Sequence, residues 1–283
     1  MANAILLISC SDRRGITASV TGFIYRNNGN IISADQHIDE QTNTFFMRVE
    51  WSLDKFALSR DKIADKFSAL AARFKMRWEL HFSDTVPQAA IFVSKHLHCL
   101  YDLLFRYKSG QLSCCIPVIF SNHPDAKKIA SDFDIEYTYL PITKSNKLAK
   151  EKKQLKILKE KKIDLIVLAR YHQVLSPAFV KPYENKIINI HHSFLPAFAG
   201  SNPYAQAYQK GVKIIGATSH YVIAQLDQGP IIEQDTVRVS HRDAIPDLKR
   251  KGEDLEKIVL SRSVRWHLTH RILCYNNKTV VFD

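Results

Sequence analysis

The pattern of apolar segments changes once along this chain, at residues 83–88. Before this stretch, the pattern of strand-like and helix-like segments includes two consecutive strands. After it, short apolar runs and helical stretches alternate one by one. The first pattern is typical of a small antiparallel sheet, and the second of a mostly parallel sheet covered by helices. We therefore expect an α/β protein with two domains, residues 1–84 and 85–283.

The N-terminal domain has the order strand, helix, strand, strand, helix, strand over residues 4–82. This is the β-α-β-β-α-β order of ferredoxin-like folds. Gly29 follows the first helix and is suited to a helix C-terminus. Asp12 and Gly15 stand where that helix begins, and the free N–H groups of its first turn could hold a carboxylate.

The C-terminal domain is expected to form a doubly wound, mostly parallel sheet. Ligands of such sheets bind beyond the carboxyl ends of the strands. Residues 244–268 predict a long helix that Gly252 interrupts, and the chain ends in a hairpin around Asn276 and Asn277.

The formal net charge of +12 raises the possibility of nucleic-acid binding. Residues 144–162 hold nine lysines and two glutamates, with Leu148, Leu155 and Leu158 at helical spacing. No aromatic side chain interleaves these lysines to stack on bases. An amphipathic helix with a solvated lysine face is favoured over a nucleic-acid partner.

The N-terminal residues and the cysteines indicate a cytoplasmic protein. The first apolar run has no basic segment before it and is too short for a signal peptide or a membrane span. The five cysteines are an odd number without a C-x-x-C pair, which argues against a disulfide framework and a zinc ribbon. We expect reduced thiols and no membrane partner.

Polar residues interrupt the strand-like stretch "KIINIHHSFLPAFAG", residues 186–200. Asn189 and His191 leave the same face of a strand, while His192 is expected to point to the other face. A metal site, an acid–base site and a structural histidine are all possible. No spacing motif announces the further ligand that zinc would need, so an acid–base site is favoured for Asn189 and His191. Asp227, in a loop before Gly229, could supply an orienting carboxylate.

These segments together resemble known families. Residues 167–176, 189–200 and 220–231 resemble the three motifs of the folate-dependent formyltransferases. Residues 4–82, with Asp12, Arg13, Gly15 and Ile16, resemble ACT regulatory domains. The whole chain is similar to the formyltetrahydrofolate deformylase family, whose members hydrolyse 10-formyltetrahydrofolate to tetrahydrofolate and formate.

The resemblance implies roles for particular residues. Asn189, His191 and Asp227 would be catalytic, with Asn189 and a protonated His191 stabilising an oxyanion while Asp227 orients His191. Neither a metal nor another cofactor is required. The folate pocket would be lined by Tyr171, Gln173, Val174, Leu175, Val222 and Ile223.

The same catalytic groups serve transfer to an amine or to water. The segment after the first strand of the C-terminal domain has no glycine, and Lys95 and His96 would obstruct close approach of a phosphate. Water is therefore favoured, and the formate would supply purine biosynthesis and balance one-carbon pools. The alternatives are a formyltransferase acting on an amine of the glycinamide ribonucleotide type and a non-catalytic amino-acid or folate sensor.

The ACT resemblance implies an amino-acid effector, glycine or methionine. It would bind at Asp12, Gly15 and Asn30, where two such domains pair. A homo-oligomer, either a dimer or a tetramer, is expected. The alternative for this domain is a purely structural dimerisation module.

Overall fold

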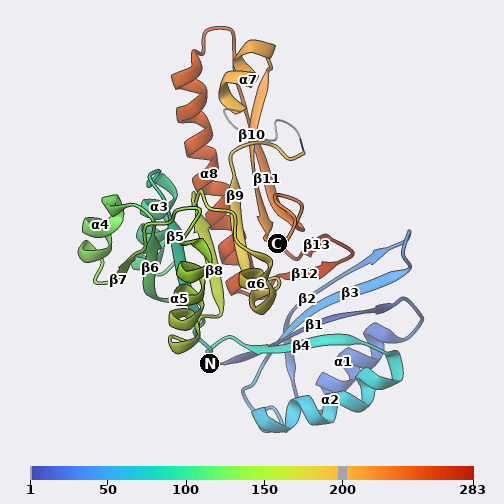
Figure 1. Ribbon diagram of the computed structural model, residues 1–283. Coiled ribbons are helices and arrows are strands. Elements are labelled where there is room, and N and C mark those ends of the chain that lie inside the picture. Colours follow the sequence, from blue (N-terminus) through green and yellow to red (C-terminus); the bar gives the residue numbers. More distant parts are fainter. Residues whose placement is uncertain (1, 197–202) are drawn as a thin grey trace. The chain divides into compact units, whose positions relative to one another are not determined.

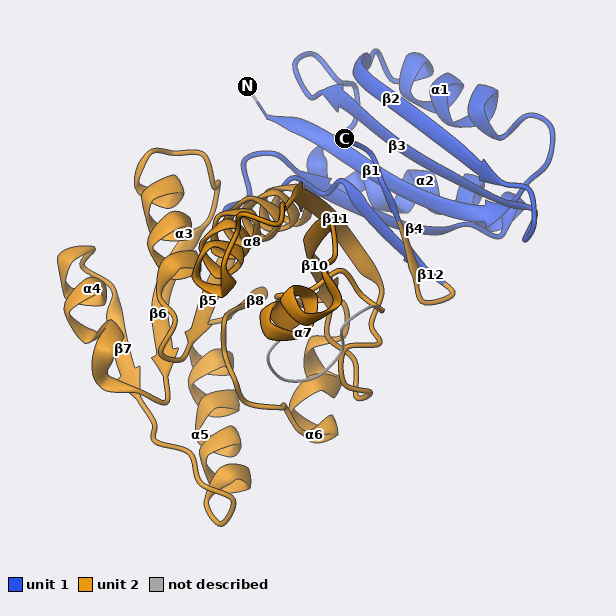
Figure 2. Ribbon diagram, turned by 90° about the horizontal axis from the view of Figure 1, so that it is seen from above, with its two compact units in different colours: residues 1–86, 269–275, 280–283 blue, residues 87–268, 276–279 orange. Residues whose placement is uncertain are grey.

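The computed structural model describes residues 2–196 and 203–283, and the chain forms two compact units (Figures 1 and 2). Unit 1 comprises residues 1–86, 269–275 and 280–283, and unit 2 comprises residues 87–268 and 276–279. Both have the fold that the sequence predicts, a ferredoxin-like domain and a mostly parallel α/β domain.

The sheet of unit 1 is antiparallel, with the strand order β2-β3-β1-β4. The elements of the unit are β1 (Asn3–Ser11), α1 (Ile16–Arg26), β2 (Asn30–Asp39), β3 (Thr44–Ser52), α2 (Arg60–Phe74) and β4 (Arg77–Phe82). Both helices lie on one side of this sheet (Figure 1). Alternation explains the packing, since Leu6 and Ile8 of β1 join the core under the helices while Leu7 faces the opposite side.

Helix α1 ends through Asn28 rather than through Gly29. Asn28 has the left-handed φ of 60°, and the N–H of Gly29 donates to the Ile24 carbonyl at 2.9 Å. A Cβ at position 29 would lie 2.5 Å from Cγ2 of Ile24 and 2.9 Å from the Phe56 ring. Close packing, not an unusual backbone angle, therefore requires glycine here.

The predicted division into residues 1–84 and 85–283 assigns the C-terminal hairpin to the second domain, whereas most of this hairpin belongs to unit 1. Its strands are β12 (Ile272–Tyr275) and β13 (Lys278–Val281), and most of their residues belong to unit 1. Four of its apolar side chains pack against Leu7 and Phe46, on the face of the sheet opposite the helices; these are Leu273, Tyr275, Val280 and Phe282. The turn of the hairpin, residues 276–279, belongs to unit 2.

Unit 2 has the strand order β11-β10-β9-β8-β5-β6-β7. Its strands are β5 (Gln88–Val93), β6 (Cys115–Ser121), β7 (Glu136–Tyr139), β8 (Leu165–Ala169), β9 (Ile187–His191), β10 (Ile214–Tyr221) and β11 (Ile231–Arg238). Neighbouring strands pair in parallel from β9 through β8, β5 and β6 to β7. Strand β10 pairs antiparallel with both β9 and β11. β8 is buried along its whole length, as the continuous apolar run predicts.

Helices cover both faces of this sheet (Figure 2). They are α3 (His98–Lys108), α4 (Lys127–Asp132), α5 (Lys147–Glu160), α6 (Pro177–Val180), α7 (Pro203–Lys210) and α8 (Ile245–Leu268). Leu158 of α5 and Phe179 of α6 pack on one face, while α3 and α8 contact each other on the opposite face. Within the described ranges, none of the helices has both the length and the hydrophobicity of a membrane-spanning segment.

Two helix predictions need correction. Helix α8 is continuous through Gly252, because this glycine makes room for a neighbouring side chain: a Cβ there would lie 2.1 Å from the Tyr204 hydroxyl oxygen. Leu148 of α5 is 65% exposed, and the buried residues of that helix are Glu151, Gln154 and Leu158. The lysine-rich face of α5 is solvated, but its buried stripe is partly polar.

Candidate active site

A cavity of about 1190 Å³ lies beside the carboxyl ends of β8 and β9, within unit 2. This is where the topology of an open parallel sheet favours ligand binding. The residues predicted for catalysis and for the folate pocket all line it, namely Tyr171, Gln173, Val174, Leu175, Asn189, His191, Val222, Ile223 and Asp227. The structure thus brings together segments that are far apart in the sequence.

Strand β9 carries Asn189 and His191 at a spacing of two, so both belong to the same face of the strand. In the antiparallel pairing with β10, His220 stands opposite Asn189 and Thr218 stands opposite His191. The Asn189 Nδ2 atom lies 3.2 Å from Nε2 of His220. The register of the β9–β10 pairing therefore determines which side chains lie next to Asn189 and His191.

The segment after β9 is fixed by Thr218. Its hydroxyl donates to the Ser193 carbonyl at 2.9 Å and accepts the Leu195 N–H at 3.0 Å. Gln234 adds a hydrogen bond from Nε2 to the Leu195 carbonyl at 2.9 Å. The end of the quoted stretch, residues 197–200, lies outside the described residues.

Asp227 reaches the cavity from the loop between β10 and β11. Its backbone has the left-handed φ of 54°, a conformation that aspartate adopts more readily than most residues. The loop lies so close to β10 that a Cβ at Gly229 would be 1.7 Å from the Tyr221 carbonyl oxygen. Asn277 of the hairpin turn donates from Nδ2 to the Gln228 carbonyl at 2.9 Å. Glycine at 229 and the hairpin turn therefore position this carboxylate.

His191 and Asp227 form a pair whose atoms Nδ1 and Oδ2 are 3.3 Å apart. Burial lowers the pKa of His191, against the opposite effect of Asp227. The His220 and His191 rings hold the pKa of Asp227 below its ordinary value, although burial raises it. At neutral pH the resting site consequently holds an aspartate anion beside a neutral imidazole, and the protonated His191 of the sequence prediction arises only after His191 accepts a proton.

The proton of the neutral His191 ring belongs on Nδ1, because the carboxylate opposite can only accept a hydrogen bond. This leaves the lone pair on Nε2. Among the described residues, Nε2 of His191 is buried and has no hydrogen-bond partner. An imidazole in this tautomer is ready to accept a proton from a bound molecule.

The prediction that His192 points away from this site is wrong. His192 lines the same cavity, and its ring centroid is 5.1 Å from that of His191. Strand β9 ends at His191, so strict alternation does not extend to the next residue. Burial, with the nearby charge of Arg170, lowers the pKa of His192 to about 4, which keeps this ring neutral.

Comparisons with known proteins agree with this geometry. Residues 88–264 match the formyl transferase family, and residues 4–72 match the ACT domain family. Over 279 residues the chain is 59% identical to the formyltetrahydrofolate deformylase of Synechocystis sp., covering 99% of this chain and 98% of that protein. The chain belongs to the formyltetrahydrofolate deformylase family.

Solved structures are similar to this chain in fold as well as in sequence. The formyltetrahydrofolate deformylase of Pseudomonas syringae pv. tomato is similar with a TM-score of 0.97 and 43% identity, covering 100% of this chain and 95% of that one. A phosphoribosylglycinamide formyltransferase from Anaplasma phagocytophilum is similar with a TM-score of 0.63 and 29% identity, over 70% of this chain and 96% of that one.

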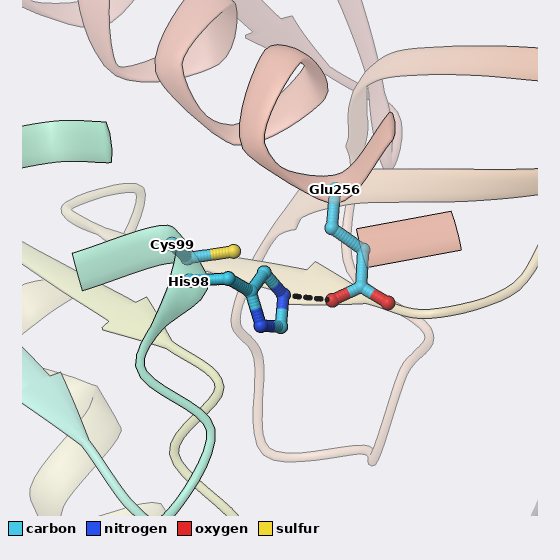
Figure 3. A group of neighbouring side chains, drawn as sticks. All are labelled: His98, Cys99 and Glu256. Atoms are coloured by element: carbon cyan, nitrogen blue, oxygen red, sulfur yellow. Dashed lines mark hydrogen bonds and ion pairs between the residues drawn. The ribbon is translucent and has the colours of Figure 1, made fainter. Parts of the chain in front are cut away.

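A second polar cluster of this deformylase-family chain lies at Glu256, and Figure 3 shows it with His98 and Cys99. Glu256 is completely buried; its Oε2 is 2.7 Å from His98 Nε2, and its Oε1 accepts the Tyr204 hydroxyl at 2.8 Å. Arg170 Nε is 3.5 Å from the same Oε2.

A metal ion does not fit this cluster. Both carboxylate oxygens of Glu256 already have partners, and the Arg170 cation is adjacent. Burial raises the pKa of the Cys99 thiol well above its ordinary value, so the thiolate that binds metals does not form. The cluster is a buried ion-pair network that joins α3, α7, α8 and Arg170, the residue after β8.

The predicted effector residues are not brought together within one chain. Gly15 precedes α1 with the left-handed φ of 89°, and Asp12 follows β1. The register pairs Asn30 with Ser52, and Ser52 with Asn3 at the other end of β1. At ~3.3 Å per strand residue, the nine residues from Asn3 to Asp12 span on the order of 30 Å, so Asn30 and Asp12 lie at opposite ends of the sheet. Any site that uses all three therefore needs a second copy of the chain.

Sequence reasoning missed several residues of the cavity. Arg170 and His220 lie inside the motifs of residues 167–176 and 220–231, but the spacing of these motifs assigns neither residue a role. The hairpin turn contributes Asn277, Lys278 and Thr279 to the lining. No local pattern links this turn to β9, because only the fold brings residues so distant in sequence together.

Proposed function

We propose that this chain hydrolyses 10-formyltetrahydrofolate to tetrahydrofolate and formate. The observation that carries the proposal is the convergence of Asn189, His191 and Asp227 in one cavity, in a chain similar to deformylases over its full length. An amide donor, a neutral imidazole and a carboxylate are what hydrolysis of a formamide at neutral pH needs.

In the first step, a water molecule attacks the formyl carbon and a C–O bond forms. His191 takes the proton of this water on Nε2, the nitrogen without a partner among the described residues. Asp227 stabilises the imidazolium through its contact with Nδ1, 3.3 Å away. The Asn189 amide donates a hydrogen bond to the oxyanion that replaces the formyl carbonyl.

In the second step, the tetrahedral intermediate collapses and the bond between the formyl carbon and N10 breaks. His191 returns its proton to N10, so tetrahydrofolate leaves as a neutral amine and the imidazole is regenerated. The formic acid loses its proton to solvent. These residues balance the reaction without a cofactor, and we propose that none is used.

Water is the proposed acceptor because of the residues between β5 and α3. An acceptor phosphate would need a loop whose backbone it can approach, whereas this segment carries Lys95 and His96. The His96 ring lies 5.3 Å from the His172 ring, and His98 is bound to Glu256. Side chains thus occupy the region where a larger acceptor's phosphate would approach.

The test is an assay with two readouts. Formate release from 10-formyltetrahydrofolate should be catalytic in the wild-type chain, and adding glycinamide ribonucleotide should not divert the formyl group. Formyl transfer to that amine would establish the alternative formyltransferase reaction. Binding of the folate without either reaction would establish the alternative sensor.

The wider roles are also proposals. The formate would supply purine biosynthesis and balance the one-carbon pools. A homo-oligomer, a dimer or a tetramer, is proposed because the ACT unit places its candidate effector residues at two ends of one sheet. A cytoplasmic location agrees with the five cysteines, which are all free thiols.

An amino-acid effector is proposed for unit 1. Glycine or methionine at millimolar concentration is expected to change kcat or KM by at least about fivefold, the lower range of typical allosteric coupling. Calorimetry and steady-state assays on the full chain measure this. Asp12→Ala should weaken binding, whereas Asp54→Ala, an exposed change elsewhere in unit 1, should not. Absence of binding for both amino acids would leave unit 1 with a structural role.

A further inference from the structure

His220 is a buried histidine beside the candidate catalytic groups. It stands opposite Asn189 in the β9–β10 pairing and is 2% exposed. Its Nδ1 lies 2.9 Å from the Tyr221 carbonyl oxygen. A carbonyl can only accept a hydrogen bond, so the proton of the ring belongs on Nδ1.

In the neutral form of the ring, the other nitrogen, Nε2, then carries a lone pair. The Asn189 amide nitrogen is 3.2 Å from it, and an Oδ1 oxygen of Asp227 is 3.6 Å from it. A carboxylate oxygen and a bare ring nitrogen both lack a proton and cannot bond to each other, whereas the amide can donate; the hydrogen bond from His220 that lowers the pKa of Asp227 therefore belongs to the protonated form of the ring. The contact between His220 and Asn189 is consequently the hydrogen bond of the resting site.

The ring is held in this orientation from the side of the Asp227 loop. Gly229 packs directly against the Tyr221 carbonyl, where a Cβ would come within 1.7 Å of the oxygen and 3.5 Å of His220 Nδ1. The Tyr221 carbonyl that holds the His220 ring is therefore also the group against which the Asp227 loop packs, through Gly229.

An amide group has two N–H bonds in one plane, about 120° apart. When His220 accepts one of them, the rotation of the Asn189 side chain is fixed and the second N–H points to another place. Asn189 also lines the cavity, so this second N–H is available to a bound formyl oxygen. Without His220 the amide would be free to turn, and a donor would be left buried without a partner.

We propose that His220 is a positioning residue for this reaction: as a neutral ring protonated on Nδ1, it accepts a hydrogen bond from Asn189 and aims the remaining amide N–H at the formyl oxygen. The inference rests on the proposed hydrolysis. His220 does not touch the reacting atoms and acts through Asn189.

The test compares His220→Phe, which removes both nitrogens, with His220→Gln, whose amide oxygen can accept from Asn189. In formate-release assays, kcat should fall about tenfold in His220→Phe, with KM changed less than threefold, because the lost contact matters most in the transition state. His220→Gln should recover most of the activity. Equal losses in both variants would overturn the proposal.

A double-mutant cycle separates positioning from general structural damage. In the Asn189→Ala background, His220→Phe should change kcat less than twofold, because its target is absent. A further tenfold loss in that background would overturn the proposal while leaving the proposed hydrolysis intact. Absence of formate release in the wild-type chain would instead overturn the hydrolysis and this inference with it.

A measurement on the intact wild-type chain covers the case in which His220→Phe does not fold. Nitrogen NMR of the His220 ring should show Nδ1 protonated and Nε2 unprotonated near neutral pH, and the Nε2 signal should move in Asn189→Ala. The opposite tautomer, or a signal that ignores Asn189→Ala, would overturn the proposal.

Discussion

Asp227→Asn is expected to lower kcat for formate release about 100-fold, the typical effect of removing one preorganised electrostatic contact. Asparagine keeps the shape of the side chain, so the loop and the cavity remain. It lacks the negative charge that stabilises the His191 imidazolium, 3.3 Å away in the wild-type chain. Steady-state kinetics at matched thermal stability measures the loss.

The pH profile of the same variant gives a second expectation. Catalysis needs neutral His191, whose pKa burial lowers from 6.5 and Asp227 raises in part. The wild-type rate should therefore be level above about pH 6.5 and fall at lower pH. Removing the charge of Asp227 removes what raises this pKa, so the acid limb of Asp227→Asn should shift to lower pH.

Asp235→Asn is the matched control for this charge removal. Asp235 lies on β11 and, unlike Asp227, is not among the residues that line the cavity. Asp235 makes a loose ion pair with Arg262 at 3.8 Å, so kcat and the pH profile should stay as in the wild type. A loss below threefold in Asp227→Asn, or an acid limb that does not move, would remove Asp227 from the mechanism.

The parts of this molecule that follow from local patterns were predictable from the sequence. Alternation on β1 separates Leu6 and Ile8 from Leu7, and the continuous apolar run of β8 indicates a strand buried on both faces. The spacing of two between Asn189 and His191 places them on one face without knowledge of the neighbouring strands. The order of the elements along the chain and the fold class followed from the pattern of these runs, whereas the order of the strands in each sheet did not.

The rest depends on contacts between distant segments. His220 meets Asn189 from 31 positions away, through an antiparallel pairing that no local pattern specifies. The sequence suggested that Gly252 interrupts α8, because the residue that requires a glycine there is not nearby in the chain. It is Tyr204, on α7, whose hydroxyl occupies the space that a Cβ at position 252 would need. The hairpin turn likewise reaches the Asp227 loop only through the fold, by the hydrogen bond from Asn277 to Gln228.

Glu256 is where we expect the largest loss of stability. The carboxylate is fully buried; it compensates the charge of Arg170, contacts the Nε2 atom of His98 and accepts a hydrogen bond from the Tyr204 hydroxyl. Removing one partner of a buried ion pair costs about 3–5 kcal/mol, because the other charge stays buried without compensation. Glu256→Ala should lower the free energy of unfolding of unit 2 by this amount in urea titrations.

Asp254→Ala on the same helix is the control, since Asp254 is 64% exposed and its pair with Lys257 lies at the surface. Its expected cost is below about 1 kcal/mol. Equal effects of the two substitutions would mean that the Glu256 network contributes no more than a surface ion pair.

The pH dependence of Glu256→Gln tests the charge separately from the packing. His98, Arg170 and Tyr204 lower the pKa of Glu256 although burial raises it, so the net direction is downward. A carboxylate with a lowered pKa in the folded state stabilises it above the ordinary value of 4.5, and this contribution is lost as the pH falls through the lowered pKa. The stability difference between the wild type and Glu256→Gln should therefore be constant near neutral pH and shrink below about pH 4.5. A difference that stays the same down to pH 3 would assign the effect of Glu256 to its shape and hydrogen bonds rather than to its charge.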